Sequence, residues 1–105
     1  MTKQNYIDDY AEAIHNVAPP ETEEWNWQPL YRYYAVLMLA KGEAVTDVDV
    51  HNAWAAWAAE HSPHSRSLVP FEALPQFVQD MDKPYTEAIH KVARLAREAN
   101  LLGRK

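Results

Sequence analysis

Cysteine is absent from this 105-residue sequence, and glycine is nearly so, with two residues. Without cysteine the chain has no disulfide, no thiolate nucleophile and no cysteine-ligated zinc site. Two glycines are too few for a glycine-rich phosphate loop, and no Gly-x-Ser-x-Gly nucleophile turn occurs. These absences exclude several large classes of enzyme and metalloprotein.

Long apolar runs and an excess of positive charge are also missing. The longest apolar run covers residues 35–40, far short of the ~20 residues that span a bilayer. The formal net charge is −5, which disfavours a general binder of phosphate backbones. The start of the chain has no basic n-region followed by an apolar h-region. We therefore expect a soluble, cytoplasmic protein that binds neither nucleic acid nor membrane.

Helical periodicity, interrupted by seven prolines, is what the sequence does contain. Apolar residues at spacings of three and four predict a helix over residues 2–17, which the Pro19-Pro20 pair ends. The remaining helices begin at prolines or capping residues, and we place them at residues 29–41, 46–60, 75 onward and 84–102. The segment 29–41 is apolar nearly all round, which predicts a central, buried helix. No segment alternates long enough to predict a strand.

The fold class is therefore all-α, and we expect a compact bundle of about five helices. A chain of this length supports one core, so residues 1–105 form a single domain.

The helix that begins after Thr46 has the most unusual chemistry. Thr46 and Asp49 have the spacing of a capping box. Trp54 and Trp57 lie about one turn apart, so their indoles either line a pocket for a flat ring or fill the core of a small domain. Two further tryptophans, Trp25 and Trp27, lie in a loop, where they either fold back on the core or mark a binding surface.

Two motifs follow one another in the second half of the chain. The first is His51-x-x-Trp54, and the second is SLVPFEALPQFVQDMDK at residues 67–83. In these motifs the chain resembles the ryanodine-receptor (RyR) domain family. The matching positions are His51, Trp54, Leu68, Val69, Pro70, Phe71, Leu74, Pro75, Asp82 and Lys83. The similarity covers about residues 45–103, which leaves residues 1–44 as N-terminal helices with a tryptophan loop.

The resemblance implies a helical core with a proline-anchored extended connector over residues 64–75, which would insert two apolar side chains into that core. It also implies binding of a small nucleotide-derived signal, which a free-standing, phage-encoded version would sequester as counter-defence. The family's turn between the two motifs shrinks here to AAEHSPHSR. The N-terminal helices and the EEWNWQ loop are therefore candidates for the missing wall of the site.

The expected ligand site combines flat rings with donors that suit a small anionic ligand. Indole supplies a stacking face, while imidazole and guanidinium groups suit a phosphate. The expected ligand-binding residues are His51, Trp54, Trp57, His61, His64 and Arg66.

A protein-interaction module is the alternative, because four tryptophans, six tyrosines and two phenylalanines suit an interface. Its docking surface would be Trp25, Trp27 and Tyr31, and its partner another protein or a second copy in a homodimer.

Catalytic and metal-binding patterns are weak. His61-x-x-His64 is the closest histidine pair, and the pattern supplies no third ligand. The acidic pairs are typical of helix ends, and Asp82, just before Lys83-Pro84, fits a helix-start carboxylate. We therefore expect a binding protein that is not an enzyme and has no cofactor and no metal.

Overall fold

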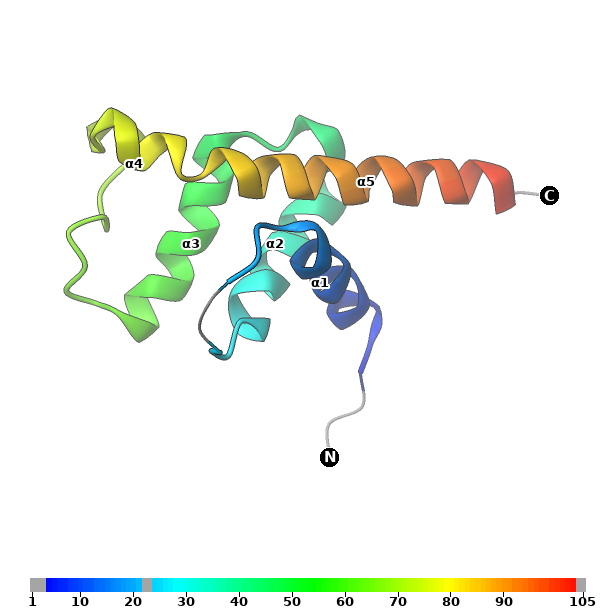
Figure 1. Ribbon diagram of the computed structural model, residues 1–105, viewed down its shortest axis with the longest axis horizontal. Coiled ribbons are helices and arrows are strands. Elements are labelled where there is room, and N and C mark those ends of the chain that lie inside the picture. The colour runs from blue at the N-terminus through cyan, green and yellow to red at the C-terminus, as the bar shows by residue number, and fades with distance from the viewer. Residues whose placement is uncertain (1–3, 22–23, 104–105) are drawn as a thin grey trace.

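The computed structural model describes residues 4–21 and 24–103. These residues form helices and turns without a strand, which confirms the all-α class (Figure 1). Four helices exceed ten residues: α1 (Tyr6–Val17), α2 (Gln28–Lys41), α3 (Asp47–His61) and α5 (Lys83–Gly103). Shorter elements are α4 (Gln76–Asp80) and the 3-10 turns η1 (Gly42–Ala44) and η2 (Phe71–Ala73). The expected number of about five helices agrees with four long helices and one short one.

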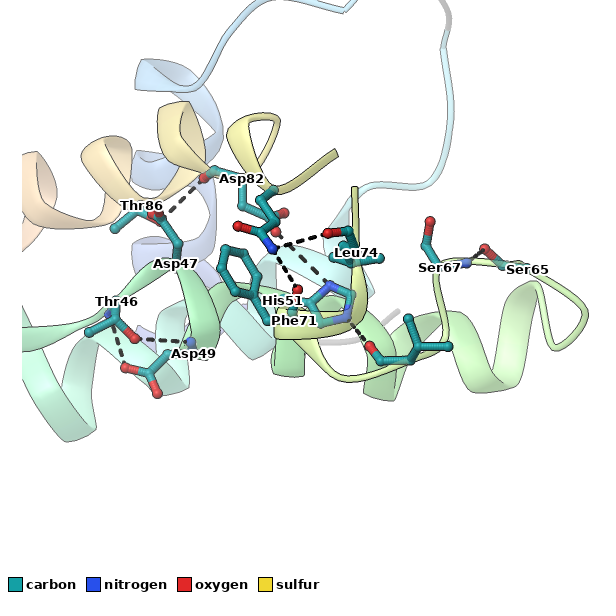
Figure 2. Close-up of polar contacts among 12 residues, drawn as sticks. Thr46, Asp47, Asp49, His51, Ser65, Ser67, Phe71, Leu74, Asp82 and Thr86 are labelled. Atoms are coloured by element: carbon teal, nitrogen blue, oxygen red, sulfur yellow. Dashed lines mark hydrogen bonds and ion pairs between the residues drawn. The ribbon is translucent and has the colours of Figure 1, made fainter. Parts of the chain in front are cut away.

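The helix ends follow local signals. Thr46 and Asp49 form the expected capping box of α3 (Figure 2). Gly42 ends α2 with a φ of +56°, a left-handed conformation that glycine adopts without a Cβ clash. Asn5 caps α1 by accepting from two backbone N–H groups, so this helix begins at Tyr6. Residues 2–3, where we expected it to begin, lie outside the described residues.

Helix α2 is central, because it packs against α1, α3 and α5. Its buried Tyr31 and Tyr34 share one core with Ile14 of α1, Val50 of α3 and Ile89 of α5. The two halves of the chain therefore build a common core. In the part of the chain that the structure describes, no helix is both long and apolar enough to cross a membrane.

The burial predicted for α2 is wrong on one face. Tyr33, Val36 and Leu39 are exposed, so the part of the chain that the structure describes leaves this side of the helix largely uncovered. The apolar residues on all sides of α2 thus predicted correctly that the helix is central, but they did not predict that one of its faces is exposed.

Two polar contacts fix α5 against the start of α3. The hydroxyl of Thr86 donates to Asp47 Oδ1 over 2.6 Å, and His90 Nε2 donates to the carbonyl oxygen of Val45 over 2.6 Å. Helix α5 runs along one side of the molecule, and its C-terminal part extends beyond the other helices (Figure 1).

Residues 62–75 connect α3 to α4 through turns and η2 (Figure 1). Gln79 Nε2 holds this connector by donating to the carbonyl oxygens of Phe71 and Leu74, each over 3.1 Å (Figure 2). Leu74 is buried, whereas Leu68 and Phe71 are half-buried. The connector is therefore a series of turns and not the extended segment that we expected. None of the apolar side chains of residues 68–71, two of which we expected in the core, is fully buried.

Candidate ligand-binding site

A cavity of about 490 Å³ opens between α2, α3, the start of α5 and the loop before α2. Six aromatic side chains from these four segments line it: Trp25, Tyr31, Tyr34, Trp54, Trp57 and Tyr85. The other lining residues are Glu21, Leu30, His51, Ser67, Val78, Met81 and Asp82. Its volume falls within the ~300–1,000 Å³ that small-molecule pockets usually have.

Helix α3 supplies one wall because residues three positions apart lie on the same helical face. His51 stacks near Trp54, with ring centroids 5.6 Å apart and planes 25° apart. Trp57 meets Trp25 edge to face, at 5.7 Å and 70°. The loop before α2 thus folds back on α3, which is one of the two alternatives that the sequence left open, and Trp25 completes the wall.

The side chain of His51 joins three segments of the chain. Its Nε2 lies 2.7 Å from the carbonyl oxygen of Val69, and a carbonyl only accepts, so Nε2 donates. Its Nδ1 faces Asp82 Oδ2 at 4.0 Å (Figure 2). His51 thus links the connector to the residue that precedes α5.

Asp82 is more than the helix-start carboxylate that the sequence indicated. Burial raises the pKa of this carboxyl group to about 6, Asp47 adds to the rise, and His51 opposes it. Its backbone carbonyl accepts from the N–H groups of Tyr85 and Thr86, so the residue directly precedes α5.

Two polar atoms of the wall are not fully satisfied. The Tyr31 hydroxyl and Trp57 Nε1 are buried and make no hydrogen bond of good geometry within residues 4–21 and 24–103, although the Glu21 carboxyl group lies beside the Tyr31 hydroxyl and helps to raise the pKa of that phenol. A buried donor left in this state costs ~1–3 kcal/mol. Burial also raises the pKa values of Tyr31 and Tyr34, so both phenols keep their protons at neutral pH and remain donors.

The structure brings three of the six expected ligand residues together at the cavity: His51, Trp54 and Trp57. His61 is exposed and lies outside the wall, where its ring stacks on Trp57 at 4.7 Å and its Nδ1 donates to the Trp57 carbonyl oxygen. His64 and Arg66 are exposed in the connector and also lie outside the wall. The side chains chosen as donors to an anion are therefore not cavity residues, apart from His51.

The three residues expected on an interaction surface pack inward. Trp25 and Tyr31 line the cavity, and Tyr31 is 1% exposed. Trp27 stacks on His15, with ring centroids 3.9 Å apart and planes 7° apart. The loop tryptophans thus cover the core and do not project from it.

Sequence reasoning missed Glu21, Tyr34 and Tyr85 as cavity residues. Tyr34 and Tyr85 fit the apolar stripes of their helices, which made them resemble ordinary core positions. The available signal was the phenol itself, because a tyrosine on a core face needs a partner for its hydroxyl. No group of three or more potential metal ligands was found among the residues that the structure describes.

Residues 5–94 match the family model described as Domain of unknown function (DUF7701), and the chain belongs to that family. The resemblance to the RyR domain family is therefore wrong. Its motif consisted mainly of prolines and apolar residues, and here those residues begin helices and pack a connector, which many helical domains require. No curated protein and no solved structure matches the chain.

Proposed function

We propose that this member of the DUF7701 family is a non-enzymatic binding module whose cavity takes a small organic molecule with a flat or compact apolar part. The observation that carries this proposal is a cavity of about 490 Å³ walled by six aromatic side chains. Protein interiors are normally filled to crystal-like density, so an aromatic opening of this size beside the core suits a ligand. The nucleotide signal was implied only by the rejected resemblance, and the proposal does not retain it.

The two buried polar atoms of the wall support the same conclusion. Buried polar groups in native proteins nearly always have a hydrogen-bond partner. Trp57 Nε1 has none within the described part of the chain, and the Tyr31 hydroxyl has only the Glu21 carboxyl group beside it; both residues line the cavity. A ligand that carries an acceptor atom would satisfy one or both, while its apolar part packs against the indoles at ~1–3 kcal/mol per stacked ring.

A thermal-shift screen with small ring compounds of negative, zero and positive charge, nucleotides included, tests the proposal. Compounds that raise the melting temperature of the wild type should lose much of that effect in Trp57→Phe, which keeps a ring but removes the N–H. Trp27→Phe is the matched control, because Trp27 is also half-buried but does not line the cavity. Equal shifts in both variants, or no shift with any compound, would contradict the proposal.

The outer face of α2 favours a second candidate function, association with another copy of the chain. Val36 is 54% exposed and Leu39 47% exposed, and with Tyr33 they form an apolar stripe. Light scattering over a range of concentrations tests it. A dimer that Val36→Glu converts to a monomer supports this candidate, and a monomer at every concentration removes it.

A further inference from the structure

We infer that the cavity takes an organic cation, an alkylammonium compound whose charged group lies between the aromatic walls and the carboxylates of Glu21 and Asp82. This inference rests on the proposed function and names the chemical class of the ligand. It follows from the charge of the cavity, from the arrangement of its rings and from an indole donor of its wall.

The charge of the lining is negative. Glu21 and Asp82 line the cavity, and the lining among the described residues contains no lysine or arginine. Lys83, the neighbour of Asp82 in the chain, pairs with Asp47 at 3.6 Å, and Arg66, the neighbour of Ser67, is exposed and does not line the cavity. His51 directs its Nε2–H at the carbonyl oxygen of Val69, so this donor is not free for an anionic ligand.

The phenols show that this charge reaches across the cavity. Burial raises the pKa of Tyr34, and both Asp82 and Glu21 add to the rise. The pKa of Tyr85 is raised by burial and then by the same two carboxylates. Phenols on α2 and α5 therefore lie within the electric field of both acids. A cation placed in this space would be attracted by both, and an anion would be repelled.

The aromatic walls suit a compact cation. Trp25 and Trp57 meet edge to face at 5.7 Å, so their planes form a corner. Indole is the best aromatic partner for a cation within ~6 Å of the ring centroid, and aromatic cages are a common way to bind quaternary ammonium groups. Trp57 Nε1, which has no hydrogen-bond partner among the described residues, calls for an acceptor on the same ligand. The ligand class is thus an ammonium compound that also carries a carbonyl, ether or hydroxyl oxygen.

Isothermal titration with acetylcholine and with its neutral isostere, in which carbon replaces the nitrogen, tests the charge directly. The two probes have nearly the same shape, so their difference in affinity reports the cation. We expect the wild type to bind acetylcholine about tenfold more tightly than the isostere. Asp82→Asn and Glu21→Gln should each reduce this preference, whereas Glu72→Gln, an exposed acid outside the cavity, should leave it unchanged. Lowering the pH from 7.5 to 5 should weaken acetylcholine binding in the wild type and less in Asp82→Asn.

The outcomes separate this inference from the proposed function. If the two probes bound with equal affinity, and Trp57→Phe weakened the binding of both, the preference for a cation would be wrong but the cavity would still be the binding site. The preference for a cation would also be wrong if neither probe bound and only neutral or anionic ring compounds stabilised the protein. In that case these compounds would raise the melting temperature of the wild type but not that of Trp57→Phe. If no compound of any charge bound, both proposals would be wrong.

Discussion

Replacing Asp82 with asparagine removes a carboxylate whose pKa burial raises from 3.8 to about 6. Between these two pH values the folded chain binds more protons at this site than the unfolded chain does. Below pH 3.8 the Asp82 carboxyl group is protonated in both states, and its full contribution to the free energy of unfolding is present. This contribution is lost as the pH rises through 6, because the folded chain then holds a buried negative charge. Asparagine has a similar shape and never ionises, so the variant avoids this loss.

The size of the effect follows from the shift. One pKa unit corresponds to ~1.4 kcal/mol, so a rise of about two units sets an upper bound of ~3 kcal/mol. The side chain of Asp82 is 19% exposed, and solvent screening reduces the effect to ~1–2 kcal/mol. The attraction to His51 is already included, because it opposes the rise in pKa. We expect Asp82→Asn to be more stable than the wild type by this amount at pH 8 and equal to it below pH 4.

Urea unfolding followed by tryptophan fluorescence between pH 3.5 and pH 8 measures this difference. Asp80→Asn is the matched control, because Asp80 is exposed and lies two positions earlier. Its difference from the wild type should vary little with pH. The assigned burial of Asp82 would be refuted if the difference in unfolding free energy between Asp82→Asn and the wild type stayed constant across this range. It would also be refuted if the variant were less stable than the wild type at pH 8.

Three further substitutions test other parts of the account by chemical denaturation. Tyr31→Phe removes a buried hydroxyl that makes no hydrogen bond of good geometry among the described residues, so the ligand-free protein should gain ~1 kcal/mol; any loss would show that the neighbouring Glu21 carboxyl group accepts from this hydroxyl in the folded chain. Thr46→Ala breaks the capping box of α3 and should cost ~1 kcal/mol; no change would mean that the cap contributes nothing. Phe71→Ala should cost ~1–2 kcal/mol, less than the ~3–5 kcal/mol of a fully buried phenylalanine, because Phe71 is half-buried; a cost above 3 kcal/mol would place it in the core.

Local signals in the sequence predicted the helices well. Thr46, Gly42 and Pro84 act through neighbours a few positions away, so their effects on helix ends can be read without a tertiary structure. Helical spacing likewise predicted that Trp54 and Trp57 share a face. These interactions depend on the geometry of a single turn.

The rest of the site depends on contacts between distant segments. Trp25 reaches Trp57 only because the loop before α2 folds back on α3, and Asp82 reaches His51 only because α5 begins beside α3. The sequence placed Arg66 close to Trp57 along the chain, but the connector turns it outward. Spacing along a loop does not determine where a side chain points, so the sequence alone could not show that Arg66 and His64 lie outside the cavity.

The indole N–H region of a two-dimensional NMR spectrum tests the central claim most directly. Each tryptophan gives one signal, and single Trp→Phe variants assign them. On titration with acetylcholine and then with the ring compounds that raise the melting temperature, the signals of Trp57 and Trp25 should move saturably while that of Trp27 stays in place. A binding cavity between α2, α3 and α5 predicts this pattern. Signals of Trp25 and Trp57 that stay fixed with every compound would contradict it.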